Sequence, residues 1–150
     1  MSYTKTNWVD GETPINAANL NNIEDGIEQN SNDIANIIES GSNANGEWIK
    51  YANGKMICTR SIDVEMPCNK SWGTLFYGSD SNVYDFSQTF KTPPRLYLFA
   101  FQRLNSSFWL SNYYNTIITT TGFYNYAIMR PTSADNVALT LNILAIGDWK

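Results

Sequence analysis

The stretch Glu47-Trp-Ile-Lys-Tyr-Ala-Asn53-Gly54-Lys-Met-Ile-Cys-Thr-Arg60 predicts the first pair of strands of an antiparallel β-fold. Asn-Gly is the dipeptide preferred in a type I′ turn and is the strongest short-range signal for a β-hairpin. On both sides of this turn, two sets of residues alternate in position along the chain, as expected for β-strands. The sets are Trp48, Lys50, Lys55, Ile57 and Thr59, and Ile49, Tyr51, Met56 and Cys58.

Aromatic and β-branched residues dominate from Glu47 onward, with turn signals at spacings of about 8–12 residues. The run Phe86–Arg95 is extended and contains Pro93-Pro94, and further strands are expected over 108–113, 115–129 and 137–149. The second of these turns near Gly122. In the strand expected over 137–149, a set of apolar residues alternates with a set of apolar and polar residues. The sets are Val137, Leu139, Leu141, Ile143 and Ala145, and Ala138, Thr140, Asn142 and Leu144. The pattern predicts an antiparallel sandwich or barrel.

The strand Leu96-Tyr-Leu-Phe-Ala-Phe101 is apolar on both of its faces. A sandwich strand needs only one apolar face for the core, so the other face must also be covered. Either a neighbouring subunit or a loop of the same chain is expected to cover it.

The composition changes near position 41, and residues 13–40 read as a helix. Thr13 suits the N-cap, Pro14 the first helical position, and Gly41 the end. We therefore expect three parts: an attachment segment and helix over 1–41, a polar linker over 42–46, and a β domain over 47–150.

Within the helix, apolar residues recur in the narrow a/d pattern of a coiled coil. Leu20, Ile27 and Ile34 occupy the a positions, and Ile23, Asn30 and Ile37 the d positions. Isoleucine at both positions favours three strands, and a buried amide such as Asn30 fixes the register. A coil of about four turns is marginal alone, so the head must also hold the chains together. The sequence thus predicts a homotrimer; the alternative is a helix packed on its own β domain.

The formal net charge of −4 is unevenly spread over the 150 residues: residues 1–41 carry −6 and the remainder +2. An acidic segment repels phosphate and the remainder has no basic cluster, so no nucleic-acid partner is expected. No segment reaches the roughly 20 apolar residues that span a bilayer, and no signal peptide is present. We expect a protein made in the cytosol without membrane insertion, with Cys58 and Cys68 as free thiols. With no histidine, neither a zinc site nor any cofactor is expected.

The run Asn7-Trp-Val-Asp-Gly-Glu-Thr-Pro-Ile-Asn-Ala-Ala-Asn-Leu-Asn-Asn-Ile-Glu24 resembles the N-terminus of tail and baseplate appendage proteins of phages that infect Gram-positive bacteria. The resemblance covers about residues 3–28. It implies that this segment attaches an appendage to other tail or baseplate proteins of a virion, assembled in the host bacterial cytoplasm.

A second group of motifs resembles the H-type lectin domain over about residues 46–149. The motifs are Gly46-Glu-Trp48, Phe86-x-x-x-Phe90-x-x-Pro93-Pro94, Thr121-Gly122-Phe123 and Ile143-Leu-Ala-Ile-Gly147. The resemblance implies a trimeric, six-stranded antiparallel β-sandwich that binds sugar in clefts between subunits. Two walls are implied: residues 71–82 of one chain and residues 130–136 of its neighbour.

The chain departs from that family at the sugar site. Members that bind N-acetylgalactosamine use an arginine and a histidine where this chain has Leu110 and, approximately, Pro131. The location of the cleft carries over, but the sugar specificity does not. The candidate carbohydrate-binding residues are Trp72, Asp80, Asn82, Arg130, Asp135 and Asn136. Trp72 also fits a core or rim position, and loop Asp and Asn residues also form turns.

These observations predict a mainly β protein with an N-terminal helix that binds host cell-wall glycan as a phage tail fibre or baseplate component. The alternative is a purely structural trimeric tail component without a glycan ligand. Catalytic residues are not expected, because the missing histidine excludes Ser-His-Asp and Cys-His arrangements. A carboxylate pair from Asp80, Asp85 and Asp135 is conceivable, but polysaccharide-cleaving phage proteins usually carry a longer, grooved domain.

The two-part organisation predicts different behaviour for two fragments. Residues 46–150 alone should stay folded, because the β domain has its own core. Residues 1–41 alone should be largely unfolded, because so short a coil cannot offset its own ordering entropy. Circular dichroism of each fragment checks this, and a strongly helical spectrum of the short fragment at micromolar concentration would contradict it.

Overall fold

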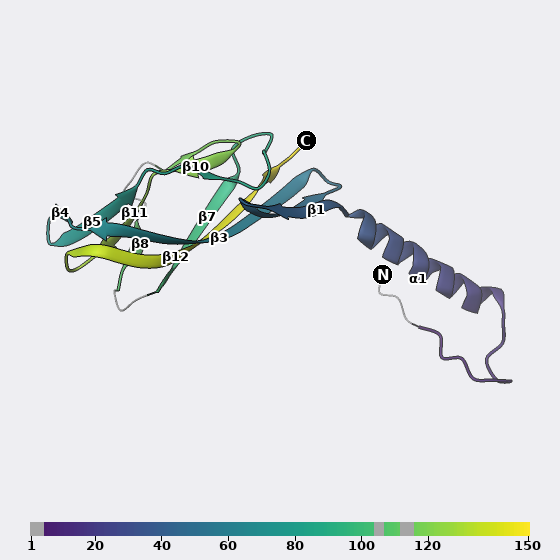
Figure 1. The fold of residues 1–150 in the computed structure, drawn as a ribbon. Coiled ribbons are helices and arrows are strands. Elements are labelled where there is room, and N and C mark those ends of the chain that lie inside the picture. Colours follow the sequence, from purple (N-terminus) through teal and green to yellow (C-terminus); the bar gives the residue numbers. More distant parts are fainter. Residues whose placement is uncertain (1–4, 104–106, 112–115) are drawn as a thin grey trace.

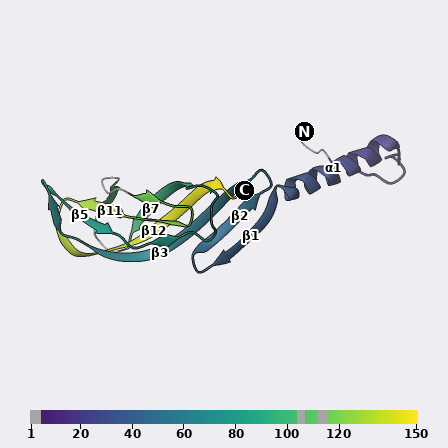
Figure 2. The same cartoon turned by 90° about the horizontal axis from the view of Figure 1, so that it is seen from above.

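A computed structural model describes residues 5–103, 107–111 and 116–150 of the chain. One helix, α1 (Ala17–Ala35), extends from one end of an elongated, two-layered β domain (Figures 1 and 2). Strands β4 and β5 lie at the opposite end (Figure 1). The expectation of a mainly β, antiparallel protein with an N-terminal helix is confirmed.

The described residues form twelve strands in three sheets, rather than the six strands that the resemblance implies. The strands are β1 (Ile37–Asn43), β2 (Gly46–Tyr51), β3 (Lys55–Cys68), β4 (Lys70–Trp72), β5 (Leu75–Asp80), β6 (Tyr84–Asp85), β7 (Arg95–Gln102), β8 (Trp109–Ser111), β9 (Ile117–Ile118), β10 (Gly122–Tyr124), β11 (Tyr126–Arg130) and β12 (Ala134–Asp148). The sheet orders are β1-β2-β3-β12-β7, β4-β5-β11-β8 and β6-β10-β9. The ends predicted for strands at 113 and 115 lie outside the described residues.

Strands β3 and β12 form the longest ladder, from Ala134 opposite Cys68 to Asp148 opposite Lys55. The alternation predicted for β12 is confirmed, since Val137, Leu139 and Leu141 are fully buried. Alternate residues have their side chains on opposite faces of a sheet, so one face of this ladder forms the core and the other faces outward.

The predicted hairpin is confirmed, but its predicted turn type is wrong. A type I′ turn needs a positive φ at both central residues, and only Gly54 has one, at 87°. The Gly54 amide donates to the Tyr51 carbonyl at 3.0 Å, and the Asn53 side chain accepts from the Lys55 amide at 3.0 Å. This longer turn places Gly54 against the C-terminal residues, where its carbonyl accepts from the Trp149 amide at 3.0 Å.

Helix α1 is shorter than the 13–40 span predicted from sequence. Its N-cap is Asn16, whose side-chain oxygen accepts from the Asn19 amide at 2.9 Å. Thr13 instead closes a turn, accepting from the Val9 amide at 2.9 Å and donating to the Asn7 carbonyl at 3.0 Å. The helix therefore begins after the turn that contains Thr13.

At its other end the helix gives way to strand β1, so the predicted linker over 42–46 is also wrong. Residues 37–43 pair with β2 from Ile37 opposite Tyr51 to Asn43 opposite Gly46. Backbone pairing with the predicted hairpin replaces the last helical turn, and β-branched Ile37 and Ile38 suit a strand. Ile37 therefore lies outside the helix, which removes the last position of the predicted seam.

The core lies between the ladder and the second layer. Phe123 is fully buried and stacks on Tyr84 at 5.3 Å between ring centroids and on Phe86 at 6.3 Å. Gly122 precedes it, and a side chain there would lie 2.6 Å from the Tyr84 carbonyl oxygen. The Thr-Gly-Phe motif thus packs tightly against the segment that begins the Phe…Pro-Pro motif.

The core position of Phe123 predicts a large loss of stability on truncation. Phe123→Ala should lower the free energy of unfolding by about 3–5 kcal/mol, because it removes buried contacts and leaves a cavity. Val83→Ala is the control, since Val83 is 66% exposed. Urea unfolding followed by fluorescence measures both variants, and equal losses would refute this assignment of the core.

Candidate functional site

Four of the six candidate carbohydrate-binding residues gather at the end of the domain farthest from α1. Trp72 ends β4, is 44% exposed and pairs with Leu75 of β5. Arg130 ends β11 opposite Phe76 of β5. The start of the predicted 71–82 wall and the start of the predicted 130–136 wall therefore lie at the same end of one chain, where β4, β5 and β11 are neighbours in one sheet (Figure 1).

Hydrogen bonds within the chain hold the polar members of this group. Arg130 donates from Nη2 to the Thr132 hydroxyl at 3.2 Å, and its Nε is buried with no partner among the described residues. Asp135 accepts from the Asn69 side chain at 3.3 Å. Asn136 donates to Glu65 at 2.8 Å. These contacts link the 130–136 loop to the far end of β3.

Asp80 and Asn82 lie elsewhere. Asp80 pairs with Tyr126 at the opposite end of the β5–β11 ladder from Arg130. Its carboxylate accepts from the Asn82 amide at 2.8 Å and from the Tyr84 hydroxyl at 2.6 Å. Within one chain these two residues therefore form a turn and anchor a buried tyrosine, rather than joining Trp72 and Arg130.

Tyr84 and Tyr126, the two tyrosines beside Asp80, both have raised pKa values. Burial, together with the Asp80 carboxylate, raises the pKa of Tyr84 from 10.0 to about 12. Burial, and next the neighbouring Tyr84, raises the pKa of Tyr126 further. The Tyr126 hydroxyl is buried and has no hydrogen-bond partner among the described residues.

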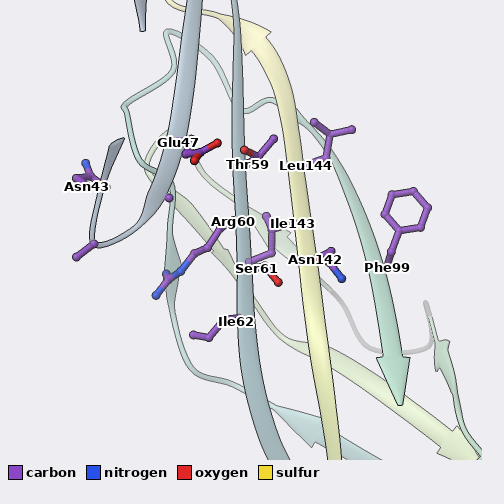
Figure 3. Close-up of a pocket in the computed structure, with 12 residues that line it drawn as sticks. Asn43, Glu47, Thr59, Arg60, Ser61, Ile62, Phe99, Asn142, Ile143 and Leu144 are labelled. Atoms are coloured by element: carbon purple, nitrogen blue, oxygen red, sulfur yellow. The ribbon is translucent and has the colours of Figure 1, made fainter. Parts of the chain in front are cut away.

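A second feature, which the sequence did not indicate, is a trough of about 740 Å³ on the outward side of the five-stranded sheet (Figure 3). Its floor includes outward residues of β3 and β12, and Phe99 of β7 stands at one side. The β1–β2 turn, held by the Asn43 side chain donating to the Ser87 carbonyl at 2.8 Å, stands at the other. The trough depends on strand register and on this turn, which explains why residue type alone did not reveal it.

The outward side of β7 carries the apolar face that the sequence predicted would need covering. Tyr97, Phe99 and Phe101 are 43%, 55% and 65% exposed. Leu96, Leu98 and Ala100 face the core. No loop among the described residues covers the outward set.

The predicted coiled-coil stripe is also uncovered in the single chain. Leu20 and Ile27 are 47% and 58% exposed, Ile23 is partly buried and Asn30 is exposed. The Ile34 side chain is not among the side chains that the structure describes. The alternative of a helix lying on its own β domain does not fit, because α1 extends away from that domain (Figure 2).

The N-terminal segment is ordered by a few hydrogen bonds and carries exposed apolar side chains. The Asn22 side chain donates to the Thr6 hydroxyl at 2.8 Å, which ties the segment to α1. Trp8, Val9 and Ile15 are 45%, 41% and 80% exposed.

Cys58 and Cys68 are free and buried, as expected. Burial raises the pKa of both thiols. In the described part of the chain, no helix is long and apolar enough to cross a membrane. The same residues contain no cluster of three or more Cys, Asp or Glu placed to hold a metal ion.

No protein-family model matches the chain, and no curated protein matches it. Similar solved structures include two fragments of R1 pyocin fibres. One is an N-truncated R1-type pyocin tail fibre, 12% identical, with a TM-score of 0.49 over 80% of this chain and 94% of that one. The other is a C-terminal portion of the Pseudomonas aeruginosa R1 pyocin fibre, 13% identical, with a TM-score of 0.48 over 89% of this chain and 32% of that one.

The raised tyrosine pKa values predict a loss of stability in alkali. Tyrosine is neutral when protonated, so the unfolded chain loses these protons near pH 10 while the folded chain retains them toward about pH 12. The free energy of unfolding should therefore be unaffected by these groups below about pH 10 and fall as the pH rises above it.

Urea unfolding at a series of alkaline pH values measures this effect. Tyr84→Phe should flatten the pH dependence, whereas Tyr97→Phe, at an exposed position, should leave it as in the wild type. The same slope in all three proteins would contradict the assignment.

Proposed function

We propose that this protein is a phage tail fibre or baseplate component whose β domain binds host cell-wall carbohydrate. The observation that carries the proposal is the placement of two different surfaces at opposite ends of the molecule. The segment that resembles virion-attachment sequences lies at one end, and strand β4, which ends at exposed Trp72, lies at the other (Figure 1). An appendage that reaches a cell needs its attachment and its binding surface at opposite ends.

The attachment end suits docking onto other tail proteins, as part of the virion. Trp8, Val9 and Ile15 are exposed on a segment that hydrogen bonds hold in place. Apolar side chains exposed on an ordered segment are typical of a surface that is buried in an assembly.

We also propose that the protein is a homotrimer joined by a short parallel coil of α1. The exposed apolar side chains Leu20 and Ile27 support this, since they lie one heptad apart on a helix that its own domain does not cover. In such a trimer, the 71–82 segment of one chain and the 130–136 loop of its neighbour form the cleft walls.

The binding end has chemistry that suits a saccharide. The Trp72 ring can stack on the apolar face of a sugar, and Arg130, Asp135 and Asn136 offer donors and acceptors for hydroxyl groups. Asp80 and Asn82 join them only if the neighbouring chain brings them close. Hydrogen bonds to sugar replace hydrogen bonds to water at small net gain, so each site should bind weakly.

A binding role fits better than a catalytic one. The chain has no histidine. The Asp80 carboxylate accepts from Tyr84 and the Asp135 carboxylate from Asn69, so contacts within the chain hold both acids.

The second candidate is a purely structural trimeric tail component. It is favoured by the contacts that Arg130, Asp135 and Asn136 make within their own chain, which satisfy part of their hydrogen-bonding capacity. Such a component should bind tail proteins but no isolated cell wall.

The proposed site predicts weak monovalent and strong multivalent binding. We expect millimolar affinity for a single sugar, raised roughly 10²- to 10⁴-fold when three linked sites engage a surface. Trp72→Ala and Arg130→Ala should reduce retention of the protein on host cell walls while leaving its assembly intact. A cell-wall pull-down with light scattering of each variant measures both properties.

Trp8→Ala is the matched control, because Trp8 is 45% exposed in the N-terminal segment, away from the proposed site. Wild-type retention by both site variants would show that the site lies elsewhere. No retention of the wild type on any host surface would favour the structural role.

A further inference from the structure

We propose that the head of each copy is joined to the next by packing of the β7 edge of one copy against the trough of its neighbour. This inference rests on the proposed homotrimer and names the surfaces that form its head interface. The occupant of the trough is thus a second copy of this chain.

The convex partner is the aromatic stripe, defined as the outward side chains of β7 and the residue that follows it: Arg95, Tyr97, Phe99, Phe101 and Arg103. Its three aromatic residues are all more than two-fifths exposed. Arg103 lies within 3.5 Å of Asp63, whereas Arg95 has no ion pair among the described residues. The stripe thus exposes three rings and one unpaired cation.

Because the stripe lies on an edge strand, leaving it exposed to solvent would favour uncontrolled association. Strand β7 is the edge of the five-stranded sheet, so one side of its backbone has no strand partner in that sheet. A long, apolar edge strand is a site of uncontrolled association unless something covers it. Contiguous exposed aromatic side chains on a soluble protein mark a contact surface.

The concave partner is the trough, on the same outward face (Figure 3). The register places Asn142 beside Phe99, and Ser61 beside Asn142, so these three lie in one row across the sheet. Ser61, Asn142 and Thr59 make no side-chain hydrogen bond among the described residues. They therefore have capacity for the Tyr97 hydroxyl and the Arg95 guanidinium of another copy.

Charge favours the same pairing. Glu47 lines the trough and Arg95 begins the stripe, whereas Asp63 and Glu65 already pair with Arg103 of their own chain and Arg60 also lines the trough. Glu47 forms no ion pair in its own chain among the described residues. Arg95 of one copy can therefore pair with Glu47 of its neighbour, whereas stripe against stripe would bring two unpaired Arg95 side chains together.

Symmetry requires two different surfaces of this kind. In a closed ring of three copies, every interface is heterologous, so each copy must present one patch to one neighbour and a different patch to the other. The stripe and the trough are such a pair, and they meet at Phe99 (Figure 3). Because β1 of the same sheet continues directly from α1, this head interface extends the contacts of the coil.

Two arginine variants and a control test the interface in the full chain. Phe101→Arg alters the stripe and Ser61→Arg alters the trough; both positions are exposed, so the chains should fold. By light scattering at micromolar concentration, each variant should fall from three chains to one chain of 17.0 kDa. Trp109→Arg, on β8, should remain trimeric, and circular dichroism verifies the fold of each.

A photo-reactive phenylalanine analogue at position 101 identifies the contact directly. After irradiation, species containing two or more chains are separated on a denaturing gel and digested with trypsin. The expected cross-links join position 101 of one copy to residues of the trough in another copy: residues 43–47 of peptide 6–50, peptides 56–60 and 61–70, or residues 142–144 of peptide 104–150. The same analogue at position 109 serves as the control and should give none of these products.

The outcomes separate this interface from the trimer itself. A trimeric wild type whose Phe101→Arg and Ser61→Arg variants also remain trimeric overturns the interface and leaves the trimer standing. Cross-links from position 101 to other peptides overturn it in the same way. A monomeric wild type overturns both the trimer and this interface, even if the protein still binds cell walls.

Discussion

The antiparallel ladder between β3 and β12 is the interaction on which the rest of the structure depends. It runs from Lys55 opposite Asp148 to Cys68 opposite Ala134. Its strict alternation sends Leu139 and Leu141 into the core and leaves Asn142 on the outward face. A one-residue slip would exchange those faces, so the hydrophobic pattern fixes the register. The register in turn fixes which side chains line the trough.

The same ladder separates the two ends of the molecule. Lys55 lies next to the turn that leads back to β1 and α1, whereas Cys68 leads into β4 and the exposed Trp72. A pair of strands of this length keeps the two ends apart at roughly 3.3 Å per residue. The surfaces proposed for attachment and for carbohydrate binding are therefore held at opposite ends of one small domain.

Apolar surface is distributed in a way that favours association. The core is closed by Phe123, Tyr84 and Phe86, yet Phe99 and Phe101 remain outside it. Leu20 and Ile27 are likewise exposed on α1. The proposed coil would be marginal alone. Because α1 continues into β1 and its sheet, the proposed coil and head contacts lie on one continuous part of the chain.

The sequence by itself determined the β-hairpin at Asn53-Gly54, the burial alternation of β12 and the two apolar faces of β7, because these follow from local side-chain periodicity. It also placed a helix near the N-terminus. Only the tertiary structure decided that Asn16 rather than Thr13 caps this helix and that Ile37 belongs to a strand. The strand at Ile37 depends on backbone pairing with residues 46–51, which local propensity does not contain. The cap depends on the turn that occupies Thr13 with Val9 and Asn7. The candidate site divides in the same way. The resemblance and residue type selected Trp72 and Arg130, on walls expected from two chains, but strand register placed both at one end of a single chain, separated Asp80 from them and assembled the trough from β1, β2, β3, β7 and β12.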